Sequence, residues 1–372
     1  MEKRRLDKLG IETSLLGFGC MRFPTLEDGK IDEILAEKML DQAMAQGVTY
    51  YDTAFPYHNG DSEPFVGRVL NKYDRSSYYL ATKLPVWMVE TREDAEKIFE
   101  DQLKRLDKEY VDFYLLHALD KERFEKVKKL GLIEMCEKFR QEGKIRYLGF
   151  SFHDDYEVFE EIINSYDWDF CQIQYNYMDT DVQAGDKGYA LAEQKGIPMV
   201  IMEPVRGGLL AGFSDDIEEM FRETRPDQSI ASWALRWVGS HANVKVILSG
   251  MSSMEQLEDN LETFGKFQPL TEAEEEAVEK AADLIRSRVK NGCTSCRYCM
   301  PCPFGLDIPK IFSLYNMTAA HREEEARAEY ETLDKKAGDC RSCHRCEKEC
   351  PQMIKVSEVM KEVAKVFEKK EA

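Results

Sequence analysis

Short apolar runs alternate with amphipathic stretches from residue 15 to about residue 290. Each run holds four to six mostly apolar residues, which is the pattern of a parallel strand buried on both faces. We therefore predict eight strands, at 15–20, 48–52, 78–83, 112–117, 146–151, 170–174, 199–202 and 244–248.

The stretches between these runs carry apolar residues at helical spacing. In 31–46 they recur every three or four positions, and Gly47 follows as a stop signal. The segments 91–106 and 130–142 show the same pattern. Eight strand–helix units in about 275 residues predict a (β/α)8 barrel. Residues 2–14 precede the first unit and predict a small hairpin over its closed end.

A doubly wound parallel sheet is the competing fold for the same alternation. Such a sheet often opens its first helix with G-x-G-x-x-G, whereas residues 17–19 hold only a fragment of that motif. We therefore predict an α/β chain whose first part is a (β/α)8 TIM barrel.

The composition changes near residue 290. Before it, the stretch 270–289 opens with a capping box, in which Thr271 caps the helix and Glu274 answers, so we predict the last barrel helix there. Beyond it lie eight of the eleven cysteines. The sequence thus predicts one domain over 1–290 and a second over 291–372.

The net charge and the N-terminal sequence indicate which partners and which cellular location to expect. The 372 residues carry a formal net charge of −19, so neither nucleic acid nor an anionic membrane is an expected partner. The first residues lack the apolar core of a signal peptide, and no stretch is apolar enough to span a bilayer. We expect a cytoplasmic protein whose cysteines serve metal or redox chemistry rather than disulfides.

Polar side chains end three consecutive predicted strands. Asp52 ends the second strand, Lys83 the third and His117 the fourth, and Tyr57 lies on the loop after Asp52. Taken singly, each has a structural explanation: a turn cap, a solvated lysine, an interior histidine or loop packing. In barrel enzymes, however, the chemistry lies at the C-terminal ends of the strands, so the four together predict an active site.

This set of side chains suits the reduction of a carbonyl group by hydride. Negative charge develops on oxygen as hydride reaches carbon, so an acid must supply a proton. The phenol of Tyr57 is a weak acid at neutral pH, and the ammonium of Lys83 would lower its pKa. Asp52 would hold Lys83, and a neutral His117 would orient the substrate oxygen. These four residues are the predicted catalytic set.

At this point the chain resembles the aldo-keto reductase superfamily, over roughly residues 4–290. The likeness rests on Asp52-Thr53-Ala54-Phe55-Pro56-Tyr57, Ala81-Thr82-Lys83, Leu115-Leu116-His117, Gly149-Phe150-Ser151, Glu203-Pro204-Val205 and the segment 249–260. The resemblance implies a small carbonyl substrate and a nicotinamide cofactor, NADP(H) or NAD(H), across the barrel mouth. It implies cofactor contacts from Ser151, Gln172, Met202, Gly250, Ser252, Gln256 and Asn260.

Three positions depart from the family pattern. Phe152 replaces the asparagine that usually follows the serine, and Met202 replaces an aromatic ring that often stacks on nicotinamide. Gln256 stands where relatives that prefer NADP often have arginine, and residues 248–260 contain no lysine or arginine. Since a 2′-phosphate usually needs a cation, the choice of nicotinamide stays open, with Arg206 as an alternative phosphate contact.

Two cysteine runs lie in the tail. Each has three cysteines separated by two residues, then a fourth followed by proline, from Cys293 to Cys302 and from Cys340 to Cys350. In two-cluster ferredoxins, the fourth cysteine of each run binds the other cluster. The spacing therefore predicts two [4Fe-4S] clusters, one on Cys293, Cys296, Cys299 and Cys350 and the other on Cys340, Cys343, Cys346 and Cys302.

Zinc is the main alternative, since four thiolates also form tetrahedral zinc sites. Zinc knuckles use cysteines two at a time, so half of each run would be spare. Helical patterns at 308–315 and 319–333 predict a small α-helical ferredoxin-like iron–sulfur domain, which is similar to the iron–sulfur-tailed branch of the aldo-keto reductases. Cys20, Cys136 and Cys171 are expected to fill the core.

Three functions remain open from the sequence, because a hydride carries two electrons, a cubane passes one, and no flavin site is recognisable. The interpretation we favour is an NAD(P)H-dependent carbonyl reductase whose clusters exchange electrons with a redox partner protein or support the fold. The alternatives are an electron carrier whose barrel binds nicotinamide, and a redox-sensing nicotinamide-binding protein without carbonyl reductase activity.

Overall fold

The computed structural model describes residues 1–319 and 323–368. The chain divides into two compact units. The first comprises Met1–Pro204 with Ala234–Leu270, and the second comprises Val205–Trp233 with Thr271–Ala372. The predicted helix 270–289 thus falls mostly within the second unit, whereas the sequence placed it in the barrel. The domain boundary at residue 290 stays a prediction.

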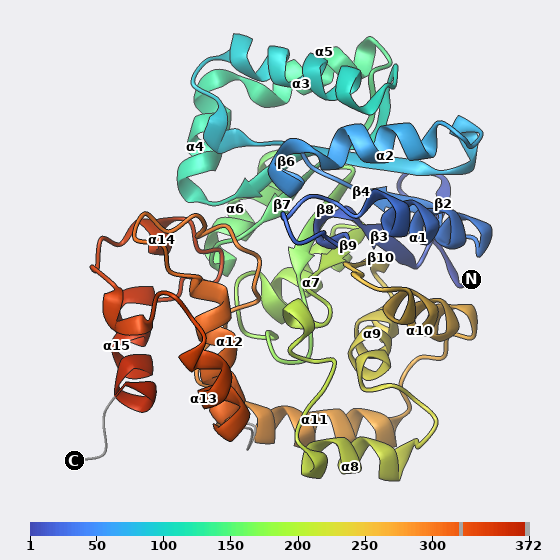
Figure 1. Cartoon of the computed structure of the whole chain (residues 1–372). Helices are drawn as coiled ribbons and strands as arrows, with labels where there is room; N and C mark the ends of the chain where they lie inside the picture. The colour runs from blue at the N-terminus through green and yellow to red at the C-terminus, as the bar shows by residue number, and fades with distance from the viewer. Residues whose placement is uncertain (320–322, 369–372) are drawn as a thin grey trace. The chain divides into compact units, whose positions relative to one another are not determined.

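The first unit is a closed barrel of eight parallel strands, which neighbour one another in chain order (Figure 1). The strands are β3 Leu16–Gly19, β4 Tyr50–Asp52, β5 Tyr79–Leu84, β6 Val111–Leu119, β7 Ile145–Phe152, β8 Phe170–Gln174, β9 Met199–Met202 and β10 Val244–Ser249. Pairing of β10 with β3 closes the ring. All eight predicted strands and the TIM barrel are confirmed, and the doubly wound sheet is wrong because this sheet has no edges.

The barrel interior is filled by side chains that alternate along the strands. Tyr50, Phe113, Phe170 and Val246 belong to one buried cluster, and Leu6 of the N-terminal hairpin joins it. This hairpin pairs β1 Lys3–Leu6 with β2 Ile11–Ser14 in antiparallel fashion, as predicted. Because side chains alternate on a strand, the residues two and four positions after these interior ones also face inward.

Helices surround the barrel (Figure 1). They are α1 Glu33–Ala45, α2 Ser62–Leu70, α3 Arg92–Leu106, α4 Lys121–Leu130, α5 Leu132–Gln141, α6 Tyr156–Ser165, α7 Gly185–Gln194, α10 Met254–Gly265 and most of α9 Ile230–Ser240, with short 3-10 helices η1 Cys20–Arg22, η2 Tyr57–Gly60, η3 Arg75–Ser77 and η4 Val86–Met88. The helix predicted over 130–142 begins at Leu132 in the structure, two residues later than predicted. Gly131 takes a left-handed conformation (φ 61) there and separates α5 from α4, which the sequence pattern did not reveal.

The second unit is helical. It contains η5 Arg206–Gly208, α8 Asp215–Thr224, α11 Glu272–Arg288, α12 Ile308–Ala319, α13 Glu323–Glu331, η6 Ala337–Asp339, α14 Arg345–Lys348 and α15 Val356–Phe367. The predicted capping box of α11 is present, with Thr271 and Glu274 bonded reciprocally. Arg288 pairs with Asp216 at 2.6 Å, and this bond ties α11 to α8.

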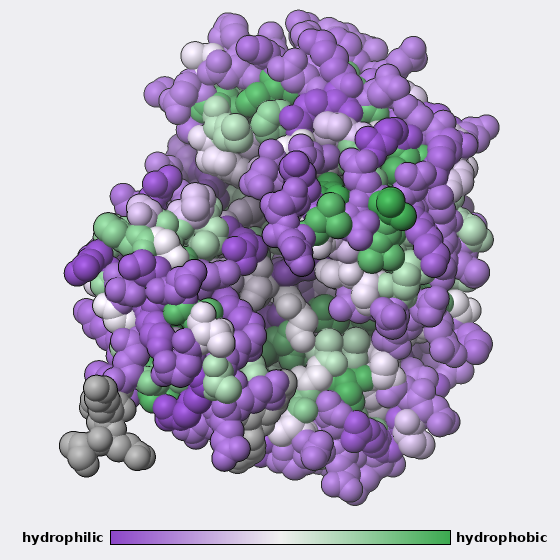
Figure 2. Space-filling view, viewed as in Figure 1, coloured by the Kyte–Doolittle hydropathy of each residue, from purple (hydrophilic) through white to green (hydrophobic). Residues whose placement is uncertain are grey.

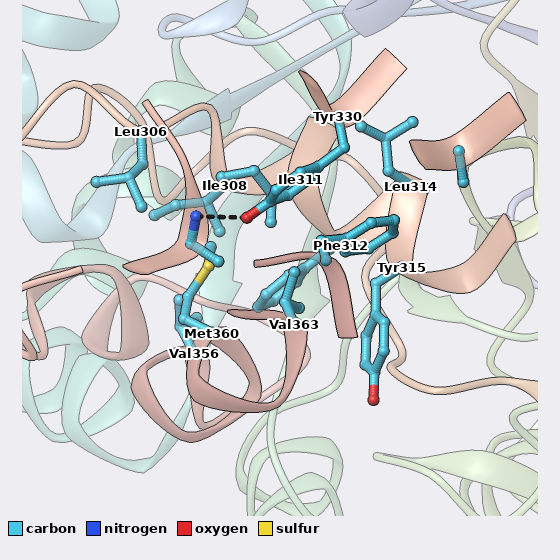
Figure 3. Close-up of a cluster of buried hydrophobic side chains, with 13 residues drawn as sticks. Leu306, Ile308, Ile311, Phe312, Leu314, Tyr315, Tyr330, Val356, Met360 and Val363 are labelled. Carbon is cyan, nitrogen blue, oxygen red and sulfur yellow. Dashed lines mark hydrogen bonds between the residues drawn. The ribbon is translucent and has the colours of Figure 1, made fainter. Parts of the chain in front are cut away.

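A separate apolar core holds the tail together. Figure 3 shows side chains of α12, α13 and α15 meeting in it, among them Phe312, Tyr330 and Met360. The Tyr330 hydroxyl accepts a hydrogen bond from the Ala337 N–H at 2.8 Å, drawn as a dashed line. Cysteines of both runs pack against this core. The expected small helical domain is confirmed.

The surface of the face seen in Figure 2 is mostly hydrophilic, with hydrophobic residues in small groups. Within residues 1–319 and 323–368, no helix combines the length and the apolar character needed to cross a membrane. Cys20, Cys136 and Cys171 are fully buried, as expected of core residues.

Candidate active site and cluster sites

The four predicted catalytic side chains meet at the C-terminal end of the barrel strands. Asp52 and Lys83 follow interior residues of β4 and β5 by two positions, so both face inward, and His117 does the same on β6. The Lys83 Nζ donates to Asp52 Oδ1 at 2.5 Å and lies 3.4 Å from the Tyr57 Oη. All four are at least nine-tenths buried.

Lys83 and Asp52 form a buried ion pair. The ammonium also donates to the Thr53 carbonyl at 2.8 Å, a contact that the sequence did not indicate. Burial raises the pKa of Asp52, and the Lys83 charge opposes that rise. The second carboxylate oxygen of Asp52 has no hydrogen-bond partner among the described residues. Lys83 is therefore the main group that stabilises the charge of the Asp52 carboxylate.

His117 is held neutral. Burial lowers its pKa well below the ordinary value, and the charges of Lys83 and Arg123 act in the same direction. Its ring lies edge-on to Tyr57, with centroids 6.1 Å apart, and 5.0 Å from Trp87. The buried Nδ1 finds no partner in the part of the chain described. The imidazole therefore retains hydrogen-bonding capacity for a ligand.

The neutral His117 predicts a loss of stability in acid. The unfolded chain takes up a proton near pH 6.5, whereas the folded chain does not, so the free energy of unfolding should fall as the pH drops below that value. One such group contributes a slope of at most about 1.4 kcal/mol per pH unit. We expect His117→Asn to flatten the pH dependence of urea unfolding between pH 7 and 5, and an unchanged slope would contradict a neutral His117.

A buried hydrogen-bond network holds the backbone at Lys83 in place. The Gln102 side-chain amide donates to the Lys83 carbonyl at 2.9 Å and to Glu63 Oε1 at 2.8 Å. The same Glu63 oxygen accepts from the Thr82 hydroxyl at 2.6 Å. Glu63 lies on α2 and Gln102 on α3, so two helices fix the backbone at the end of β5.

The same network reaches the tyrosine loop through Arg105. Its Nε donates to Glu63 Oε2 at 2.8 Å, and its Nη2 donates to the carbonyls of Phe55 and Gly60, on either side of Tyr57. The sequence pattern did not reveal this network. Its one available signal was a set of polar residues on the otherwise apolar inner faces of two helices.

The residues expected at the nicotinamide ring lie on neighbouring strands. Ser151 of β7 is the register partner of Gln172 on β8, and the Gln172 Nε2 lies 3.5 Å from the Met202 sulfur at the end of β9. The Ser151 hydroxyl accepts from the Ala118 N–H at 2.7 Å. The Gln172 Oε1 is buried and without a partner in the described chain. That orphaned oxygen fits an amide N–H of a ligand.

The residues expected at the phosphate end lie in the loop after β10 and in α10, and they form hydrogen bonds within this segment. The Ser252 N–H donates to Gln256 Oε1 at 2.8 Å, and the Asn260 amide donates to the Ser249 hydroxyl at 2.8 Å. The side chain of Arg22 packs on this loop from elsewhere in the chain, and its guanidinium lies 3.5 Å from Glu203 Oε1. A Cβ on Gly250 would lie 2.9 Å from the Arg22 Cδ, so Arg22 covers the loop, which the sequence did not show.

Arg206, the alternative phosphate contact, lies in the other compact unit. Its Nη2 would be 3.1 Å from a Cβ on Gly292, next to the first cysteine run. The neighbouring Gly207 takes a left-handed conformation (φ 65), and a side chain there would clash with the Thr294 carbonyl. Arg206 therefore packs on the cysteine run, and its phosphate contact stays a prediction.

The eight tail cysteines surround two separate hollows. Cys293, Cys296, Cys299 and Cys350 line the first. Cys302, Cys340, Cys343 and Cys346 line the second. Each hollow thus takes three cysteines from one run and the fourth from the other. This is the crossed grouping that the spacing predicts.

The thiols of each group influence one another. Burial, together with Cys296, Cys293 and Cys350, raises the pKa of Cys299 to about 12. In the described residues, no three His, Cys, Asp or Glu side chains converge as they would on a single metal ion. Four cysteines line each hollow, which is the number of ligands of a [4Fe-4S] cluster, and bound iron would supply the positive charge that lets neighbouring thiols ionise.

Comparison with known proteins matches both parts of the chain. Residues 15–283 match the Aldo/keto reductase family, and residues 292–357 match the 4Fe-4S dicluster domain. The uncharacterized oxidoreductase YqkF of Bacillus subtilis is 28% identical, over 75% of this chain and 96% of its own. L-galactose dehydrogenase of Arabidopsis thaliana is 24% identical, over 78% and 96%. The holo form of an aldo-keto reductase from Bacillus halodurans is 29% identical, over 76% and 96%, with a TM-score of 0.63.

Proposed function

Because this chain belongs to the aldo/keto reductase family and carries a 4Fe-4S dicluster domain, we propose that it reduces a small aldehyde or ketone with a reduced nicotinamide. One observation carries this proposal. A single buried ammonium, that of Lys83, is hydrogen-bonded to Asp52 at 2.5 Å and lies 3.4 Å from the hydroxyl of Tyr57. This arrangement supports an acid whose proton is tuned by a fixed positive charge.

The proposed roles follow from the contacts. A bound reduced nicotinamide supplies hydride to the carbonyl carbon. Tyr57 donates its phenolic proton to the carbonyl oxygen, and Lys83 stabilises the phenolate that remains. Asp52 keeps the ammonium in place, and neutral His117 donates a hydrogen bond to the same oxygen. The product is the alcohol, and Tyr57 regains its proton from solvent.

For the nicotinamide, we propose the residues that the family resemblance implies. Ser151 and Gln172 would bind the carboxamide, and Met202 would contact the ring; the orphaned Gln172 Oε1 supports this assignment. Gly250, Ser252, Gln256 and Asn260 would line the adenosine phosphate end, against which the carbon stem of Arg22 packs. Titration with NADPH and with NADH tests which of the two is bound.

For the tail, we propose two [4Fe-4S] clusters on the crossed cysteine groups, which exchange electrons with a redox partner protein or support the fold. The grouping around two hollows supports it. Paired substitutions offer a sharp test. We expect the double variant Cys299→Ser/Cys350→Ser to lose one cluster and keep about four of about eight irons, whereas Cys346→Ser/Cys350→Ser should lose both.

Anaerobic iron and acid-labile sulfide analysis reads this result directly. Uncrossed clusters, each on a single run, would reverse the two outcomes. The same preparation shows whether a flavin is bound, which the proposed direct reduction does not need.

The activity itself is tested by mixing the anaerobic holoprotein with NADPH or NADH and a panel of small aldehydes and ketones. Consumption of nicotinamide matched by alcohol is the expected result. Binding of nicotinamide without turnover of any carbonyl would instead favour an electron carrier or a redox-sensing protein.

A further inference from the structure

Arg123 lies one aromatic ring away from His117. It stands in the first turn of α4, just after β6, and its guanidinium carbon is 5.4 Å from the ring centroid of Trp87. Trp87, in η4 after β5, is in turn 5.0 Å from the His117 ring. The distance from the guanidinium carbon to the ring of His117, a proposed catalytic group, is therefore no greater than the sum of these two distances.

One edge of this guanidinium is unused. Its Nη1 donates to the Ala118 carbonyl at 2.9 Å and lies 3.1 Å from Asp120 Oδ2. The Nε and Nη2 atoms make no hydrogen bond with any residue that the structure describes. These two N–H groups point the same way, and such a fork matches the two oxygens of a carboxylate.

The surroundings of Arg123 favour an anion. Lys126, one turn further along α4, donates to the carbonyls of Val86 and Val89, and it forms no ion pair with a carboxylate of the described residues. Asp120 does pair with Arg123, but both side chains are part-exposed, and such a pair is weak. The chain as a whole is strongly acidic, with a net charge of −19. Two cations on one side of the site therefore attract a negative ligand locally.

We propose that Arg123 binds a carboxylate on the carbonyl substrate through its Nε and Nη2 atoms. The substrate class is then an aldehyde or ketone that carries an acid group a few carbons from the carbonyl. This inference rests on the proposed reductase function and adds the substrate class to it. Arg123 determines specificity and takes no part in the proton transfer.

Substrate pairs of equal chain length test the proposal. We expect the wild-type holoprotein to reduce 4-oxobutanoate with a higher kcat/KM than butanal. Arg123→Met should lower kcat/KM for 4-oxobutanoate about 10- to 100-fold, mostly through KM, the size expected for lost hydrogen bonds to a charged group. Butanal should change by less than about twofold, because it lacks the group that Arg123 binds.

Lys121→Met is the matched control, since it removes the same charge from an exposed position in the same turn of α4. It should leave both substrates unaffected. An equal loss for both aldehydes in Arg123→Met would overturn the proposal and assign Arg123 a structural role through Ala118. No loss for either would overturn it as well.

A binding measurement separates this inference from the proposed function. Succinate mimics 4-oxobutanoate without a reducible carbonyl, and calorimetry on the nicotinamide-loaded protein measures its affinity. If wild type reduces no carbonyl of the panel, the reductase function fails, yet succinate binding that is lost in Arg123→Met still supports the anion site. Equal affinity in both proteins, or no binding by wild type, overturns it.

Discussion

Tyr57→Phe should lower the turnover number for carbonyl reduction by about 10²- to 10⁴-fold, the usual contribution of a positioned general acid. The change removes one oxygen atom and keeps the ring, which lies 6.1 Å from the His117 ring and 5.0 Å below the Lys83 ammonium. Lys83 and Asp52 remain paired. Reduced nicotinamide should therefore bind with unchanged affinity while the proton has no donor.

Tyr73→Phe is a suitable control for this variant. It also deletes one phenolic oxygen, which bonds Asp41 at 2.6 Å just beyond the end of α2. Turnover should not change there. Steady-state rates and a fluorescence titration with NADPH or NADH measure the two effects. A Tyr57→Phe protein that still reduces carbonyls at the wild-type rate would exclude Tyr57 as the acid.

Lys83→Met should have the largest effect on stability, a loss of about 3–5 kcal/mol in the free energy of unfolding. Lys83 is fully buried, and Asp52 is 2% exposed. Without the ammonium, a carboxylate would remain in the barrel with no compensating charge. Activity should fall as well, because the phenol of Tyr57 loses the cation that favours its ionisation.

Two measurements distinguish the lost ion pair from a packing defect as the cause of this lower stability. Burial raises the pKa of Asp52, and without Lys83 nothing opposes that rise. The deficit should therefore shrink as the pH falls from 7 to 5, because the carboxyl becomes neutral. The double variant Asp52→Asn/Lys83→Met should regain most of the stability at pH 7. If urea unfolding shows the double variant to be as unstable as Lys83→Met, the lost ion pair is not the cause.

The barrel was predictable because its strands are continuous apolar runs, a pattern that buried parallel strands share. Helix α4 was not, since Lys121–Leu130 carries few apolar residues and merges in the pattern with the stretch that follows. Only the left-handed Gly131 divides them. The grouping of α11 with α8 also escaped prediction, because it depends on contacts between segments about seventy residues apart, such as Arg288 with Asp216 at 2.6 Å.

Within the candidate site, the sequence indicated the residues that end strands. Strand ends of a barrel meet at one face, so Asp52, Lys83 and His117 could be placed together from order alone. The contacts made by Glu63, Gln102 and Arg105 could not be predicted. The sequence of a helix shows which face is buried, but it does not show which residues of α2 lie next to which residues of α3. Arg123 could not be predicted for a similar reason, because an arginine on a helix with many charged residues is expected to be exposed to solvent.

The cysteine grouping shows how far spacing alone can reach. Two runs of four allow several pairings, and the preference for a crossed pattern came from the general behaviour of two-cluster ferredoxins. The structure brings the same groups around two hollows. What the clusters do for the barrel was not readable from spacing, because spacing defines ligands and carries no information on electron transfer.

We propose that hydride passes directly from nicotinamide to the carbonyl carbon, without passing through the clusters as separate electrons. The measurement uses reduced nicotinamide that carries deuterium at both C4 positions, mixed anaerobically with the holoprotein and a reducible aldehyde. Mass spectrometry and NMR then locate the label in the alcohol. We predict one deuterium on the carbinol carbon of each product molecule. A product that carries hydrogen from solvent at that carbon would contradict direct transfer and assign the reduction to the iron–sulfur tail or a flavin.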